Sequence, residues 1–128
     1  YMKYVYPVVL TKEENGYYVR IPDFNSSTQG KDLADAIEMS RDLIGLMAID
    51  FEEDKKVIPL PNSVEFEKEE SDIVTLVDVN FLEYKKKHSN KMVRKNLTIP
   101  YWLNVEAERA GVNFSQVLQV ALKEKLNV

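Results

Sequence analysis

The chain has 128 residues, of which 45% are hydrophobic and 30% charged, a composition that suits one folded domain or two small ones. It contains no cysteine, which excludes disulfides, thiolate catalysis and thiolate metal sites and fits a reducing cytoplasm. No apolar run approaches the roughly 18 residues of a membrane span and no basic-apolar leader pattern occurs, so we expect a cytoplasmic protein with no membrane partner.

The formal net charge of −4 conceals two oppositely charged parts. Residues 1–80 carry 8 Lys and Arg against 17 Asp and Glu, a balance of −9, whereas residues 81–128 carry 9 against 4, a balance of +5. This asymmetry is expected if the second part meets a polyanion and the first part meets a basic protein.

The first 30 residues predict a three-stranded antiparallel meander. Two strand-like runs, 2–11 and 17–24, flank Asn15 and Gly16, a dipeptide typical of tight hairpin turns. A short third strand is expected to end at Gly30. A sheet of this kind needs another element to cover its apolar face.

A helix is predicted to follow directly. Asp32 is placed to act as its N-cap, with Asp35 in the first turn, and the helical pattern continues to about Glu53. Apolar residues recur at helical spacing, so this helix can lie across one face of the sheet. The predicted inner stripe consists of Leu33, Ile37, Ile44, Met47, Ala48 and Phe51.

Residues 54–72 predict a long loop, with IPLPN near its middle and acidic residues after it. Loops of this length often form binding surfaces. The segment 73–82, IVTLVDVNFL, predicts a buried strand. The polar residues 83–91 are predicted to be a linker, in which three consecutive lysines would favour nearby DNA and His88 would be exposed.

The basic part begins with a predicted strand from Val93 to Ile99. Its apolar residues share one parity and its polar residues the other, so one face would be buried while the other offers hydrogen-bonding groups. Pro100 cannot donate to a strand ladder but suits the first turn of a helix, so it ends the strand. A helix is expected from about Tyr101 to Ala110.

A second helix is predicted beyond Gly111, which is placed where a left-handed C-terminal cap would lie. Asn113 is the expected N-cap, and Gln116 completes a capping-box pattern. Apolar residues recur at helical spacing as far as Leu126, a wide apolar face for so short a helix. A unit of about 35 residues with one unpaired strand is too small to build its own core, which predicts a two-fold partner.

Two such units would pair their strands into an antiparallel ribbon, which fits the major groove of DNA. The motifs VRKNLTIP, WL and GVNFSQVLQVAL resemble the ribbon-helix-helix family of dimeric repressors. The resemblance implies that Arg94, Asn96 and Thr98 read bases, a role for which guanidinium, amide and hydroxyl groups are suited. An ordinary edge strand with solvated polar residues is the alternative for this segment.

The same resemblance implies two further sets of residues. Phosphate contacts would come from lysines near the strand and from backbone amides at the start of the second helix, where the helix end is positive: Lys91, Lys95, Asn113, Phe114 and Ser115. The dimer core would consist of apolar residues from the strand and both helices: Leu97, Ile99, Trp102, Leu103, Val117, Leu118, Ala121 and Leu122.

The acidic part has a resemblance of its own. Its stretches IPDFNSSTQGKDLADAIEMSRDLIGL and IPLPN look like those of HicB-type antitoxins, in which a partial RNase H-like domain neutralises a small RNA-cleaving toxin, HicA. Some members of that family carry a ribbon-helix-helix tail. One departure is KDL after STQG, where an acidic residue and a hydroxyl would be expected; this affects only contacts with the toxin near that point.

The resemblances imply an α+β protein with a β-β-β-α-β partial RNase H-like domain at 1–82, a linker at 83–91 and a ribbon-helix-helix domain at 92–128. The expected partners are a HicA-type toxin, operator DNA and a second copy of the chain, with higher-order complexes including the toxin left open. Acidic and aromatic residues are candidates for the toxin contact: Asp23, Phe24, Asp50, Glu53 and Asp54.

Two other functions remain open from the sequence. A metal-dependent RNase H-like nuclease would need several carboxylates on adjacent strands, yet Asp78 is the only acid in the last predicted strand of the body and residues 2–11 contain none. We therefore expect no metal or other cofactor and no catalysis. A repressor that senses a small ligand through its acidic part is the other alternative.

Overall fold

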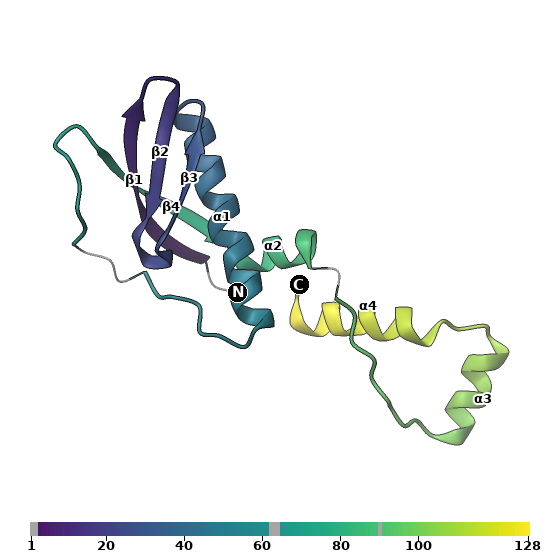
Figure 1. The fold of residues 1–128 in the computed structure, drawn as a ribbon. Coiled ribbons are helices and arrows are strands. Elements are labelled where there is room, and N and C mark those ends of the chain that lie inside the picture. The colour runs from purple at the N-terminus through teal and green to yellow at the C-terminus, as the bar shows by residue number, and fades with distance from the viewer. Residues whose placement is uncertain (1–2, 62–64, 90) are drawn as a thin grey trace. The chain divides into compact units, whose positions relative to one another are not determined.

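The computed structural model describes residues 3–61, 65–89 and 91–128. The chain forms two compact units, Tyr1–Lys91 and Met92–Val128, each of which is described by itself (Figure 1). Within the described residues, no helix is both long and apolar enough to cross a bilayer.

The first unit is built on a four-stranded antiparallel sheet with the strand order β3-β2-β1-β4. Its strands are β1 (Lys3–Glu13), β2 (Gly16–Ile21), β3 (Ser26–Gly30) and β4 (Ile73–Asn80). The predicted hairpin is confirmed, because Gly16 adopts a φ of 142° at the β1–β2 turn, a value that L side chains rarely adopt. A short 3-10 helix, η1 (Pro22–Phe24), separates β2 from β3.

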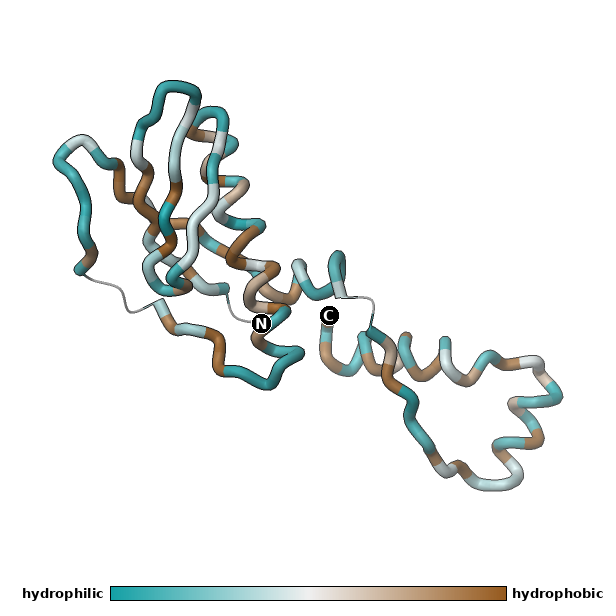
Figure 2. Tube along the Cα trace, in the orientation of Figure 1, coloured by the Kyte–Doolittle hydropathy of each residue, from teal (hydrophilic) through white to brown (hydrophobic). Residues whose placement is uncertain are grey.

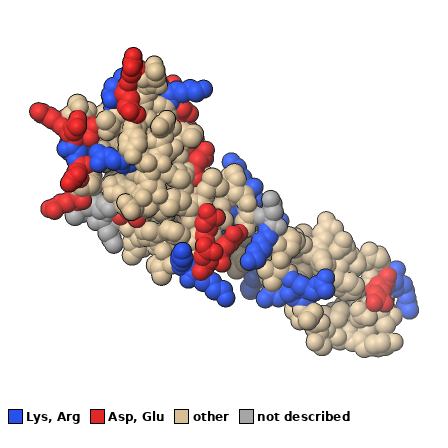
Figure 3. All heavy atoms as spheres, in the orientation of Figure 1, with Lys and Arg blue, Asp and Glu red and all other residues tan. Residues whose placement is uncertain are grey.

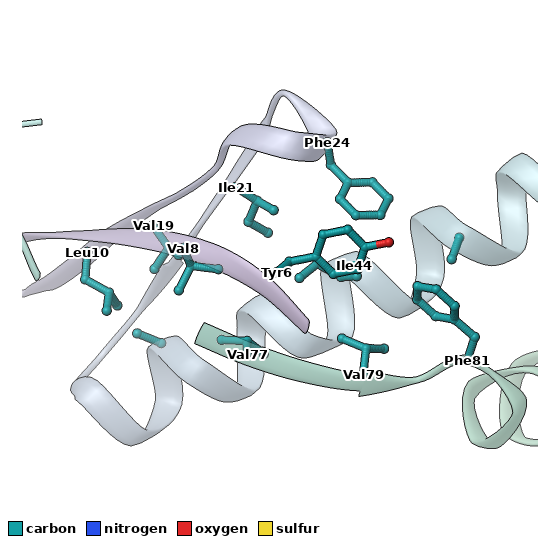
Figure 4. Packing of buried hydrophobic residues seen from close by; sticks show 12 residues of the cluster. Tyr6, Val8, Leu10, Val19, Ile21, Phe24, Ile44, Val77, Val79 and Phe81 are labelled. Atoms are coloured by element: carbon teal, nitrogen blue, oxygen red, sulfur yellow. The ribbon is translucent and has the colours of Figure 1, made fainter. Parts of the chain in front are cut away.

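Helix α1 (Leu33–Glu53) covers one face of this sheet, and Asp32 caps it by accepting a hydrogen bond from the Asp35 backbone N–H at 2.8 Å. Side chains of α1 pack on inward residues of the strands, as Figure 4 shows around Tyr6 and Ile44. The predicted stripe was wrong at Leu33, which is 45% exposed. The residues with 0% exposure recur every four positions along the helix, and Leu33 lies outside this line: Ala36, Ser40 and Ile44.

The described parts of the segment 54–72 are bonded to the sheet at several points, and residues 62–64 of the predicted loop lie outside the described residues. The Tyr6 hydroxyl donates to the Pro59 carbonyl at 2.6 Å, and burial raises the pKa of Tyr6 to about 12. On the face of the sheet away from α1, Arg20 donates to the Glu67 carbonyl at 2.7 Å and pairs with Asp72 at 3.2 Å. These bonds hold a loop that local sequence could only mark as irregular.

Strand β4 differs from the prediction in extent and in burial. It ends at Asn80, not at residue 82, and only one parity of its residues is buried, with Val77 and Val79 at 1% and 0% exposure. Leu76, on the opposite face, is 66% exposed. The apolar run predicted a buried strand, but α1 covers only one face of β4 and the residues on its other face are exposed.

Most of the segment predicted as a linker, 83–91, is helical: its residues 83–88 belong to α2 (Phe81–His88). Asn80 caps it by accepting the Glu83 N–H at 3.3 Å, and Phe81 is 5% exposed and stacks on Tyr4 with ring centroids 5.0 Å apart. The Tyr84 hydroxyl donates to Asp42 of α1 at 2.7 Å. Asn80 and Glu83 are a capping pattern that would have predicted this helix from the sequence.

Candidate functional site

The second unit contains the residues predicted to contact DNA, apart from Lys91, the last residue of the first unit. Its first segment, 92–100, was predicted to include a strand but has no strand in the structure, and all its residues are exposed. A strand needs a neighbour to pair its backbone groups, and the described residues of this single chain supply none. Arg94, Asn96 and Thr98 are accordingly exposed, as are Lys91 and Lys95.

Two helices follow, α3 (Tyr101–Arg109) and α4 (Phe114–Leu126), close to the predicted bounds. Gly111 between them has a φ of 71°, in the left-handed region expected of a cap glycine. The predicted N-cap is confirmed, because the Asn113 side chain accepts the Gln116 N–H at 3.1 Å. Phe114 and Ser115 therefore lie in the first turn of α4, where backbone amides point out of the helix end.

The second unit has no buried residue. Figure 2 shows hydrophobic residues at intervals along α3 and α4. The residues predicted to form a dimer core are all exposed or half-buried in the single chain, with exposures of 67% for Leu97, 67% for Trp102 and 50% for Leu122. So much exposed apolar surface on so small a unit is typical of an interface.

Lys and Arg predominate on the second unit, whereas acidic side chains are spread over the first unit in the view of Figure 3. Four of the acids predicted to contact a toxin gather at one end of the first unit. Phe24 of η1 stacks on Phe51 near the end of α1, with ring centroids 6.0 Å apart, and this contact brings η1 to the last turns of the helix. The acids at this end are Asp23, Asp50, Glu53 and Asp54.

Phe24 itself does not belong to an exposed surface. Its side chain is 6% exposed and also meets the Tyr6 ring edge-on at 5.0 Å, so it is part of the core. An aromatic residue beside an acid in a turn could not be distinguished from a surface contact by sequence alone. Asp50, Glu53 and Asp54 are exposed and remain available to a partner.

The described residues include no group of three or more acidic or histidine side chains placed to hold a metal ion. Asp78, the acid weighed as a nuclease residue, is instead bound to Arg41 of α1, whose guanidinium lies 3.1 Å from the carboxylate. This hydrogen bond lowers the pKa of Asp78 below its ordinary value. Asp78 therefore lies in an ion pair with α1, and the same Arg41 guanidinium also pairs with Glu38 at 2.7 Å.

The neighbouring contacts between α1 and α2 are also structural. Burial and the hydrogen bond to Asp42 raise the pKa of Tyr84, so its hydroxyl stays protonated and keeps donating to that carboxylate. Lys85 pairs with Glu52 at 3.3 Å. These residues attach α2 to α1.

Several solved structures are similar to this chain over nearly its full length. A chain of the toxin-antitoxin complex from Streptococcus pneumoniae is 26% identical, covers 97% of this chain and 99% of its own length, and has a TM-score of 0.58. The antitoxin HicB3 is 22% identical over 94% and 96%, with a TM-score of 0.52, and the Burkholderia pseudomallei antitoxin HicB is 21% identical over 98% and 99%, with a TM-score of 0.48. No protein-family model and no curated protein sequence matches. The chain is therefore similar in fold, over nearly all its length, to the antitoxin HicB3 and to a chain of a toxin-antitoxin complex.

Proposed function

We propose that this protein is an antitoxin that neutralises a small RNA-cleaving toxin and represses its own operon as a DNA-binding dimer. The observation that carries the proposal is the nearly full-length similarity to a chain of a toxin-antitoxin complex, at 26% identity. The charges of the two units support it: residues 1–91 carry 12 Lys and Arg against 18 Asp and Glu, a balance of −6, and residues 92–128 carry 5 against 3, a balance of +2. The first surface suits a basic protein and the second a polyanion.

The first unit supplies the toxin-binding surface in this proposal. A toxin that cleaves RNA must hold a polyanion and is therefore expected to be basic, and the charge of −9 on residues 1–80 would speed its capture and fix its orientation. The acids at the end of α1, Asp50, Glu53 and Asp54, are exposed and close together along the helix. Affinity itself would come from apolar contacts that the toxin buries.

The second unit supplies the DNA-binding surface. Pairing of two copies of segment 92–100 would satisfy backbone groups that are open in the single chain and would cover Leu97 and Ile99. Arg94, Asn96 and Thr98 would then project from the other face of the ribbon towards base edges. In each of the two copies, the backbone amides at the start of α4 would hold a DNA phosphate.

The toxin proposal is tested by co-expressing the full chain with the small protein encoded beside it in its genome and measuring the mass of the product. A stable complex, and growth restored when that protein alone is inhibitory, are expected. The paired variant Asp50→Lys and Glu53→Lys should weaken the complex. Its matched control is Glu13→Lys with Glu14→Lys, an equal charge change at the opposite end of β2. A chain that forms no complex and gives no protection would refute the antitoxin function.

The DNA proposal is tested with Arg94→Ala and Lys95→Ala on operator and random DNA. Losing a bidentate base contact should cost about 1–3 kcal/mol on the operator and little on random DNA. Lys95→Ala should weaken binding to operator and to random DNA equally, and it should reduce the slope of log affinity against log salt concentration by about one. Equal losses on both DNAs for Arg94→Ala would show that Arg94 contacts phosphate, not a base.

A further inference from the structure

The segment that follows α1 exposes two apolar side chains. Val57 is 88% exposed and Leu60 is 57% exposed, and no other large hydrophobic residue among the described residues is as exposed as Val57. Ile58, which lies between them, packs instead against the hydrophobic core of the first unit. The segment 57–61 is therefore attached to the core through one side chain while two others face solvent.

Hydrogen bonds hold this segment in place. The Lys56 N–H donates to the Phe51 carbonyl at 2.7 Å, and the Tyr6 hydroxyl donates to the Pro59 carbonyl at 2.6 Å. Tyr6 has no exposed surface, and Figure 4 shows its ring among the core residues. The backbone that carries the exposed side chains is thus bonded to α1 at one point and to the core of the sheet at another.

Two prolines stiffen the same segment. Pro59 and Pro61 have a fixed φ, and each restricts the residue before it, Ile58 or Leu60, to extended conformations. Exposed side chains on a backbone that is already ordered cost a partner little conformational entropy on binding. Val57 and Leu60 are therefore preorganised for contact with another molecule.

The net charge of the first unit comes entirely from the stretch that contains this segment. Residues 50–72 carry 3 Lys against 9 Asp and Glu, a balance of −6. Of the 12 basic and 18 acidic residues in 1–91, this leaves 9 of each for the rest of the unit, a balance of zero. Attraction for a basic surface is therefore local to this stretch and is not a property of the whole unit.

Most of the acids in this stretch are not engaged in ion pairs. Two are paired, Glu52 with Lys85 and Asp72 with Arg20. The other seven are exposed and form no ion pair among the described residues: Asp50, Glu53, Asp54, Glu65, Glu67, Glu69 and Glu70. Their carboxylates flank the exposed apolar segment on both sides in the chain.

Apolar anchors with acidic neighbours suit a basic protein, because buried apolar contacts supply affinity while charges around them speed association and fix orientation. The same charge would repel a nucleic acid or an anionic membrane. We infer that Val57 and Leu60 are the apolar anchors of a surface that binds a basic protein, with Glu53 and Asp54 at its rim. This inference rests on the proposed function, in which that protein is the toxin, and it identifies the contacts on which affinity depends.

Calorimetry of the full chain with the small protein encoded beside it tests the anchors. Covering the exposed part of Leu60 accounts for a roughly 5- to 20-fold gain in affinity, so Leu60→Ala should weaken binding by about that factor, and Val57→Ala should weaken it too. The matched control is Leu76→Ala, the same substitution at a residue of β4 that is 66% exposed. It should bind as the wild type does, and melting curves should show that all three variants remain folded.

The association rate tests the rim independently. Neutralising two adjacent acids with Glu53→Gln and Asp54→Asn should slow association severalfold at low salt and change dissociation little. The matched control, Glu13→Gln with Glu14→Gln, removes the same charge from another adjacent, exposed pair. It should leave the association rate close to that of the wild type.

The outcomes separate this inference from the proposed function. If the wild type forms the complex but Val57→Ala and Leu60→Ala bind as tightly as it does, the antitoxin function stands and the inference is overturned. A loss of affinity for Leu76→Ala as large as that for Leu60→Ala would overturn it as well, because the contact would then not be specific to this segment. A wild-type chain that forms no complex refutes the proposed function, and the inference fails with it.

Discussion

Truncating Leu122 to alanine should weaken the dimer of the second unit while leaving the first unit folded. Leu122 is 50% exposed in the single chain. Full burial of a leucine side chain is worth about 1.5–3 kcal/mol, so covering the exposed half in each of two copies contributes about 1.5–3 kcal/mol in total. A dimer that lacks this contribution should dissociate about 10- to 150-fold more readily.

The chain provides its own probe for this measurement. Trp102 is the single tryptophan, it lies in the second unit and it is 67% exposed in the single chain. Its emission should therefore move to longer wavelength on dilution as the dimer separates, and this midpoint should occur at a higher concentration for Leu122→Ala.

Val120→Ala is the matched control for Leu122→Ala. Val120 lies on the same helix and is 49% exposed, but its helical position is outside the predicted dimer core. Its midpoint should stay close to that of the wild type. A Leu122→Ala midpoint equal to the wild-type value, or an equal shift for both variants, would show that the apolar face of α4 has been assigned to the wrong partner.

Two further substitutions test the first unit. Gly45→Ala should lower the melting temperature, because the added Cβ would overlap the ring of Tyr84 and push α2 away from α1; a melting curve unchanged from wild type would refute this packing. Asp72→Asn should destabilise at neutral pH, since the carboxylate accepts the Glu69 N–H and lies beside Arg20, contacts that lower the pKa of Asp72. A carboxyl group whose pKa is lowered in the folded state stabilises the fold at pH values above its unfolded pKa of about 3.9, and this stabilisation is lost as the pH falls. The difference in stability between wild type and Asp72→Asn should therefore shrink below about pH 4. A difference that does not change with pH would refute the assignment.

Local signals account for the parts of the fold that were predicted correctly. Asn15 and Gly16 specify a turn, Asp32 and Asn113 satisfy amides at helix starts, and Gly111 adopts the left-handed conformation at a helix end. Each of these choices depends on a few neighbouring residues. The same chemistry at Asn80 and Glu83 was present and was overlooked because the lysines that follow resemble a solvated linker.

Long-range packing accounts for the parts that were not predicted. Leu33 fits the apolar period of α1, but whether it is covered depends on where the sheet ends. The extent of β4 depends on its position at the sheet edge. Phe24 is buried only because η1 folds back against Phe51. The segment 93–99 is the clearest case, since no strand among the described residues pairs with it.

The opposite charges of the two units have a consequence for regulation under the proposed function. The −9 of residues 1–80 is tethered to the unit that would approach DNA, and it reduces the attraction due to the +5 of residues 81–128. A basic toxin bound to the acidic part would remove this repulsion, so operator affinity should rise when the toxin is present and the gain should diminish at high salt, where exposed charges are screened. Operator binding measured at two salt concentrations, with and without the toxin, distinguishes this effect from contacts between toxin and DNA, which would also raise affinity for random sequences. A gain that does not depend on salt would indicate that the toxin acts by ordering the DNA-binding dimer.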